Sequence, residues 1–144
     1  MSKEILAVEN IELNVSVKDK EEAIRKTGQI LVDKGYVEPS YIEKMLEREE
    51  LTTTYMGNFV AIPHGTEDAK KAVIESGLSI VQVPEGVSFN GEIVKVLIGI
   101  AGKGDEHLEI LSQIAIVCSE EENVNQIVEA KSAAEILNLF NEVN

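Results

Sequence analysis

The distribution of apolar and polar residues predicts β-strands in three segments of the chain. Residues 11–17 (IELNVSV) alternate one by one, which is typical of a strand with one buried face. Residues 78–83 (LSIVQV) and 93–101 (IVKVLIGIA) are also predicted as strands, and the second is apolar at nearly every position, as in a central strand covered on both faces. Residues 84–86 (PEG) are expected to form a turn between them.

Two helices are predicted in the first third of the chain. Asp19 followed by Glu22 resembles a capping box, and the helix it opens is expected to run to Lys34, with Gly35 as its stop signal. A second helix is predicted from about Pro39, because proline is tolerated in a first helical turn. Its apolar stripe is expected to consist of Tyr41, Ile42, Met45 and Leu46.

Three further helices are predicted. Thr66 is a plausible N-cap for a helix closed by Gly77, and residues 105–120 (DEHLEILSQIAIVCSE) form a longer one. One face of that longer helix is expected to carry Leu108, Leu111, Ala115 and Cys118, with Ile110, Ile114 and Val117 beside it. Ser132 with Glu135 forms a second capping box, which opens a final helix. That helix carries Ile136, Leu137 and Phe140.

The order of these elements predicts the fold class. Residues 51–65 (LTTTYMGNFVAIPHG) are too rich in β-branched residues and glycine for a helix, and residues 59–62 are predicted as a buried strand ended by Pro63. Strands that alternate with helices predict an α/β fold, a mixed β-sheet flanked by α-helices. One compact domain over residues 1–144 is expected, since a chain near this length buries about 68–70% of the surface that it exposes when unfolded.

Charge and composition narrow the class of partner. The chain has 26 acidic residues against 13 lysines and arginines, a net charge of −13. Nucleic acid and anionic membranes require a concentrated positive face, so neither is an expected partner, whereas a protein with a basic docking surface is compatible. The simpler interpretation is that the acidic residues only solvate the surface. With no apolar run long enough to cross a bilayer, no signal-peptide layout and a single cysteine, Cys118, we expect a cytoplasmic protein without disulfides or membrane insertion.

Two histidines, His64 and His107, are the best candidates for chemistry. Each follows an apolar strand and small turn residues, and each lies at or near the start of a predicted helix (FVAIPHGTEDA and VLIGIAGKGDEHLEI). If the strands 59–62 and 93–101 run parallel in one sheet, both histidines lie at its carboxyl edge, where open α/β sheets bind ligands. The two side chains would then face one another across a crevice.

The surroundings of His64 suit a phosphoryl acceptor. Neutral imidazole is a good nucleophile near pH 7, Pro63 stiffens the loop, and Gly65 leaves room for an approaching group. The amides at the start of the following helix would favour an anion, and phosphoryl transfer depends mainly on positioning and charge stabilisation. A loop histidine is nevertheless more often a surface or hydrogen-bonding residue, and a histidine in a first helical turn, such as His107, is more often a solvated helix residue.

Other chemistry has weaker support. The two histidines, with Asp105 or Glu106 as a third ligand, could bind zinc, but no HxxxH or clustered ligand spacing is present. Cys118 lies among aliphatic residues and is expected to be a core thiol rather than a nucleophile. The sequence has no GxxxxGK[ST] loop, no GxGxxG after a strand and no GxSxG elbow.

Residues 49–65 (EELTTTYMGNFVAIPHG) resemble the active-site signature of the type-2 enzyme IIA proteins of the phosphoenolpyruvate-dependent sugar phosphotransferase system. The signature is an acidic or amide residue (Glu49), six residues, Met56 and Gly57, two residues, and then residues 60–65 (VAIPHG). The resemblance covers essentially the whole chain, from KEEAI through GYVEPSYIEKMLERE to GDEHLEILSQIA. It is strongest to the mannitol branch, since fructose and nitrogen-regulatory relatives more often read STGIG where this chain reads LTTTYMG.

The resemblance implies a phosphoryl relay. His64 would accept a phosphoryl group on Nε2 from the phosphohistidine of the carrier protein HPr, and would pass it to a cysteine of the cognate IIB domain of a membrane mannitol transporter. His107 matches a second active-site histidine that assists transfer. Arg48 matches an arginine at the end of the second helix, where a guanidinium suits a phosphoryl dianion, although a cation there also suits the helix dipole alone.

The same resemblance implies one type-2 IIA domain over residues 1–144, with no metal and no organic cofactor. A fructose-type or regulatory IIA module, which binds a partner according to its phosphorylation state, is the alternative. The presence of both His107 and Arg48 favours transport over regulation. A metal-binding protein that uses both histidines is the third possibility.

Overall fold

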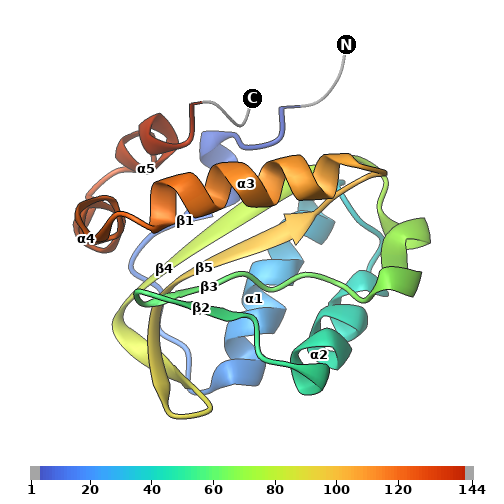
Figure 1. Cartoon of the computed structure of the whole chain (residues 1–144), viewed down its shortest axis with the longest axis horizontal. Helices are drawn as coiled ribbons and strands as arrows, with labels where there is room; N and C mark the ends of the chain where they lie inside the picture. Colours follow the sequence, from blue (N-terminus) through green and yellow to red (C-terminus); the bar gives the residue numbers. More distant parts are fainter. Residues whose placement is uncertain (1–3, 142–144) are drawn as a thin grey trace.

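A mixed sheet with the strand order β1-β4-β5-β3-β2 lies at the centre of the computed structural model, which describes residues 4–141 (Figure 1). The strands are β1 (Ile11–Glu12), β2 (Tyr55–Gly57), β3 (Val60–Ala61), β4 (Gly77–Phe89) and β5 (Glu92–Ala101). β4 and β5 form a long antiparallel hairpin, β1 pairs parallel with β4, β3 pairs parallel with β5, and β2 pairs antiparallel with β3. The predicted α/β fold with a mixed sheet is confirmed.

Helices cover both faces of this sheet (Figure 1). The helices are η1 (Val8–Asn10), α1 (Lys20–Asp33), α2 (Tyr41–Leu51), η2 (Glu67–Ala72), α3 (Glu106–Cys118), α4 (Glu121–Glu129) and α5 (Ala133–Leu139). Helices α1 and α2 pack on one face, and α3, α4 and α5 pack on the other. A hydrophobic core lies on each face of the sheet, and adjacent residues of β5 contribute to different cores. Leu97 packs toward α1 and α2, and Ile98 packs toward α3. This explains why that strand is apolar at nearly every position.

Both predicted capping boxes are present. Asp19 accepts a hydrogen bond from the backbone N–H of Glu22 at 2.9 Å, and the Glu22 carboxylate accepts one from the N–H of Lys18 at 2.9 Å. The Ser132 hydroxyl accepts from the N–H of Glu135 at 3.3 Å at the start of α5. Side chains that satisfy the free amides of a first turn fix where a helix begins, so these two starts are correctly predicted.

Three predicted elements are shorter than expected. The strand predicted over residues 11–17 ends at Glu12, because Asn14 adopts the left-handed conformation (φ 54°) and breaks the regular ladder, although the Val15 N–H still donates to the Gln82 carbonyl of β4 at 2.9 Å. The strand predicted over 59–62 is reduced to the two residues of β3. The helix predicted after Thr66 is a 3₁₀ segment that ends at Ala72, and the Thr66 hydroxyl donates to Asp68 instead of capping the helix.

The turn between β4 and β5 lies later than predicted. Residues 84–86 belong to β4, where a register shift between Gln82 and Val87 absorbs them as an irregularity in the ladder. The chain reverses instead at Asn90 and Gly91, whose φ values of 56° and 98° fit the positive angles that a two-residue hairpin turn requires. Proline and glycine in residues 84–86 therefore mark an irregular strand and not its end.

The expected buried face of the helix over residues 105–120 is only partly correct. In α3 the buried residues are Ile110, Ile114 and Cys118, whereas Leu108 is 69% exposed and Ala115 is exposed. Apolar residues surround most of this helix, so the pattern alone did not define one face. Helix α4, which the sequence analysis did not predict, follows directly and packs against the same core.

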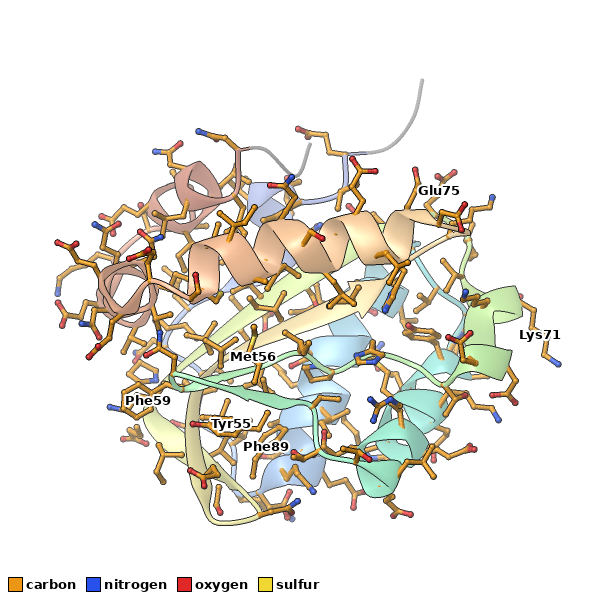
Figure 2. All side chains as sticks on the ribbon, in the orientation of Figure 1. Tyr55, Met56, Phe59, Lys71, Glu75 and Phe89 are labelled. Carbon is orange, nitrogen blue, oxygen red and sulfur yellow. The ribbon has the colours of Figure 1, made fainter. Side chains whose placement is uncertain are left out.

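The turn between β2 and β3 carries two consecutive residues with positive φ, Asn58 at 56° and Phe59 at 69°. A bulky residue in this conformation is rare outside tight turns. The Phe59 ring lies at the periphery of the molecule (Figure 2), 5.1 Å from the ammonium of Lys95. The tight turn returns the chain directly into β3, which leads to His64.

Candidate functional site

Sheet pairing fixes the backbone of His64 at the carboxyl end of β3. The residue forms a parallel bridge with Ile100 of β5, and the Ile100 N–H donates to the carbonyl of Pro63 at 2.9 Å. The Nδ1 atom of the imidazole lies 2.7 Å from the carbonyl oxygen of Ile62. Because a carbonyl only accepts, Nδ1 carries the proton in this contact, and the lone pair of the neutral ring is on Nε2.

His107 lies in the first turn of α3 and faces His64. The ring centroids are 5.3 Å apart and the ring planes are inclined by 57°. Strands β3 and β5 run parallel, so the segments that follow them leave the sheet at the same edge. The prediction that the two histidines face one another across the carboxyl edge of the sheet is confirmed.

The two histidines lie in a cleft of about 530 Å³ that the end of α2 and the η2 segment also line. Arg48 is in the last turn of α2, and its Nη1 atom donates to the carbonyl of Thr52 at 2.7 Å. A guanidinium has five N–H groups, so this bond leaves donors for an anion in the cleft. Of the two lysines in η2, Lys70 lines the cleft, whereas Lys71 points outward (Figure 2). The structure thus brings Arg48 and both histidines together.

Burial is the main cause that lowers the pKa of His64, and the Arg48 cation lowers it further. The bond to the Ile62 carbonyl and the carboxylates of Glu49 and Glu67 act in the opposite direction, but they do not cancel the effect of burial. The ring is therefore neutral at neutral pH. In this form Nε2 is a nucleophile.

The pKa of His107 is lowered as well. Burial is again the main cause, followed by the nearby His64 and the Lys70 ammonium, while Glu67 acts in the opposite direction. Two neutral rings at this distance avoid the repulsion that two imidazolium cations would have. A neutral imidazole still has one N–H, so His107 can donate to an oxygen bound near His64.

Tyr41 is a site residue that the sequence analysis placed only in the core. Its hydroxyl accepts from the N–H of Gly65 at 2.9 Å and donates to the carbonyl of Ile100 at 2.8 Å. A Cβ atom on Gly65 would lie 2.6 Å from the Tyr41 ring, so this close packing requires glycine. The Gly65 amide is therefore occupied, and the expectation that the amides after His64 receive an anion does not hold for this one. Only the tertiary fold reveals this contact.

Within residues 4–141 no three histidine, cysteine or acidic side chains are grouped so that they could hold a metal ion. Glu106, considered above as a ligand, accepts a hydrogen bond from Ser76. Burial raises the pKa of the Cys118 thiol to about 12, so this cysteine is unreactive at neutral pH. Over the same residues, no helix combines the length and the apolar character needed to cross a membrane.

Replacing Gly102 with alanine is expected to destabilise the protein by about 1–3 kcal/mol and to displace His107. The new Cβ would lie 2.5 Å from Cα and 2.9 Å from N of His107, which are backbone atoms that cannot move aside cheaply. Urea unfolding and the NMR signals of the His107 ring would measure both effects. Gly104→Ala is the control, because no heavy atom lies within 4 Å of a Cβ there and the cost is limited to its positive φ of 62°. A Gly102→Ala protein as stable as wild type, with unchanged ring signals, would contradict the expectation.

Comparison with known proteins gives consistent similarities over nearly the whole chain. A profile of the family described as phosphoenolpyruvate-dependent sugar phosphotransferase system, EIIA 2, matches residues 4–143. The mannitol-specific phosphotransferase enzyme IIA component of Geobacillus stearothermophilus is 66% identical over 145 residues and covers 100% of both chains. The protein of the same name in Bacillus subtilis is 58% identical over 142 residues, covering 98% of this chain and 99% of the relative.

Solved structures agree with this similarity. The crystal structure of IIA mannitol from Escherichia coli superimposes with a TM-score of 0.87 at 41% identity, over 94% of this chain and 98% of the other. The complex of enzyme IIAMTL and phosphorylated enzyme IIBMTL from the same organism gives a TM-score of 0.88 at 38% identity, over 95% of this chain and 97% of the other.

Proposed function

The chain belongs to the EIIA 2 family of the phosphoenolpyruvate-dependent sugar phosphotransferase system, and from this premise we propose that it is a mannitol-specific IIA component whose phosphoryl carrier is His64. It accepts the group from the phosphohistidine of HPr and passes it to a cysteine of the IIB domain of a membrane mannitol transporter. One observation carries the proposal: the lone pair on Nε2 of a neutral imidazole in a cleft lined by Arg48 and His107.

Each transfer step uses the same atom of His64. In the first step the Nε2 lone pair attacks phosphorus, the N–P bond of phosphorylated HPr breaks, and the HPr imidazole leaves with that electron pair. The Nδ1 proton stays in place and donates to the Ile62 carbonyl, which stabilises the positive charge that the ring acquires. In the second step a cysteine thiolate of IIB attacks phosphorus, and Nε2 regains its lone pair.

Arg48 and His107 stabilise the transferring group in this proposal. The guanidinium offers donors and a positive charge to the phosphoryl oxygens, and His107, with its ring centroid 5.3 Å from that of His64, donates one N–H to them. Neither residue forms a bond to phosphorus. Both functions were expected from the family resemblance, and the shared cleft supports them.

The surface around the cleft supports protein partners of the proposed kind. The rim carries the exposed carboxylates Glu47, Glu67 and Asp68, and Leu51 beside them is 71% exposed. A carrier with basic and apolar residues around its own phosphorylated side chain complements such a rim. The proposal also includes one IIA domain over residues 1–144, a cytoplasmic location, and function without a metal or organic cofactor.

Transfer onward to a IIB domain tests the proposed function. The protein is first phosphorylated with phosphoenolpyruvate, enzyme I and HPr, and then mixed with the mannitol IIB domain, with the fructose IIB domain as control. The expected result is rapid loss of the phosphoryl group to a cysteine of the mannitol IIB domain and slower loss to the fructose domain. Stable phosphorylation with no transfer to the mannitol domain would favour a regulatory module, and faster transfer to the fructose domain would favour the fructose branch.

A further inference from the structure

Glu49 is a buried carboxylate that the transfer steps described above do not use. Only 3% of the residue is exposed, although it lies on α2 directly after Arg48. One carboxylate oxygen, Oε1, accepts from the backbone N–H of Thr54 at 2.9 Å and from its hydroxyl at 2.6 Å. The Nζ atom of Lys20 lies 3.5 Å from the other oxygen. Burying a carboxylate is costly unless it is paired and hydrogen-bonded, so these contacts explain how it is tolerated and raise the question of what it holds.

The backbone continues from Thr54 to the imidazole of His64. The Thr54 carbonyl accepts from the N–H of Ile62 at 3.0 Å. The Ile62 carbonyl in turn accepts from Nδ1 of His64 at 2.7 Å. Glu49 is therefore connected to the His64 ring through two residues, each of which is fixed by a hydrogen bond on either side. A displacement of Thr54 would be passed to the carbonyl that orients the ring.

The loop between α2 and β2 is held at a second point by the neighbouring residue. Arg48 donates from Nη1 to the carbonyl of Thr52, while Glu49 binds Thr54 two residues later. The same short loop thus supports both the guanidinium and the imidazole. Loosening the loop at Glu49 would affect the two cleft groups together.

We propose that Glu49 is a positioning residue for phosphoryl transfer: by fixing Thr54 it holds the Ile62 carbonyl that binds the Nδ1 proton of His64, and so keeps Nε2 free toward the cleft. The expected effect on the rate of phosphoryl transfer rests on the proposed function. The tautomer of the His64 ring can be measured without any partner protein. The carboxylate acts through its position, because its two bonds to Thr54 require an acceptor oxygen at a fixed place. A role that depended on charge alone would require only the negative charge.

Two variants separate position from charge. Glu49→Gln removes the charge but keeps an acceptor oxygen at the same distance from the helix. Glu49→Asp keeps the charge but shortens the side chain by one methylene, which withdraws the acceptor from Thr54. Glu50→Gln is the matched control, since Glu50 is the next residue of α2 and its side chain is exposed.

Two readouts follow the variants. Long-range ¹H–¹⁵N NMR spectra of the unphosphorylated protein report which ring nitrogen of His64 carries the proton, with His107 as an internal reference. Single-turnover phosphorylation by HPr reports the rate. In Glu49→Asp we expect partial loss of the Nδ1-protonated form and roughly a tenfold slower transfer, because small displacements of a reacting group are costly. Glu49→Gln and Glu50→Gln should retain the wild-type tautomer and a rate close to wild type.

Two results would overturn the proposal: a Glu49→Asp protein with the wild-type tautomer and rate, or a Glu49→Gln protein that loses as much as Glu49→Asp does. Should Glu49→Asp fail to fold, Thr54→Val replaces it, because valine keeps the shape of threonine and removes one of the two bonds to the carboxylate. It is expected to shift tautomer and rate in the same direction by less, and unchanged values would count against the proposal. If HPr does not phosphorylate the wild-type protein, the proposed function fails, whereas the tautomer spectra still decide the role of Glu49.

Discussion

Replacing His64 with alanine is expected to abolish phosphorylation of the protein by HPr. The Nε2 atom of this residue forms the bond to phosphorus in both transfer steps, and no neighbouring group in the cleft can replace it. His107 lacks the bond to the Ile62 carbonyl that fixes the ring of His64, and Cys118 is buried with a pKa raised to about 12. Intact mass spectrometry after incubation with phosphoenolpyruvate, enzyme I and HPr measures the result: wild type gains one acid-labile phosphoryl group and the variant gains none.

The conservative variant His64→Gln serves as a control for folding, since glutamine fills much of the same space without an aromatic nitrogen. Thermal unfolding of both variants should resemble that of wild type, because the ring is only half-buried at the cleft. A phosphoryl gain in either variant would show that another residue accepts the group, and His107 would then be the first to examine.

Replacing His107 with alanine is expected to slow transfer by about a hundredfold, the cost typical of removing one donor that stabilises charge in the transition state. The final extent of phosphorylation should equal that of wild type, because the acceptor is intact. The ring of His107 has its centroid 5.3 Å from that of His64, close enough to reach an oxygen of the transferring group. Rapid-quench measurement of a single turnover separates the rate from the extent.

A different side chain at position 107 can restore the hydrogen-bond donor. His107→Gln restores an N–H group and should recover part of the lost rate. Loss of both rate and extent in His107→Ala, equal to that in His64→Ala, would show that His107 takes part in the bond-making chemistry. A wild-type rate would instead make it an ordinary residue of the first turn of α3.

The parts of the fold that the sequence predicted correctly are those set by local chemistry or by a strong apolar pattern. The starts of α1 and α5 follow from Asp19 and Ser132, whose side chains bind amides only three residues away. The apolar run in β5 identified a strand buried on both faces. The sequence analysis placed both histidines at one edge of the sheet on the condition that the strand before His64 and β5 run parallel, and this condition holds.

The elements that were wrong depend on distant partners or on a conformation that the pattern does not encode. The alternation over residues 11–17 continues past Glu12, but the positive φ of Asn14 ends the strand there. Residues 84–86 have turn chemistry, yet pairing with β5 absorbs them into an irregular strand. The signal for the true turn was present at Asn90 and Gly91, since this dipeptide favours the two-residue hairpin turn.

The residues of the candidate site also divide into those marked by the sequence around them and those that depend on contacts across the fold. His64 and His107 are both marked by their position after apolar strands in the sequence, whereas Arg48 and the assisting function of His107 were identified only through the family resemblance. Tyr41 had no local signal, because a tyrosine in an apolar stripe is common, and Glu49 was noted only as the first residue of the family signature, with no function assigned to it. Their significance comes from contacts across the fold, with Gly65 and Ile100 for Tyr41 and with Thr54 for Glu49.

The central claim is that the phosphoryl group is carried on Nε2 of His64, and NMR of the phosphorylated, ¹⁵N-labelled protein tests it most directly. Coupling between ³¹P and ¹⁵N identifies the atom bonded to phosphorus, and long-range spectra assign that atom to a ring. The account predicts coupling to Nε2 of His64, with the proton still on Nδ1 and donated to the Ile62 carbonyl. Phosphorus bonded to Nδ1 of His64, to either nitrogen of His107 or to the sulfur of Cys118 would contradict it.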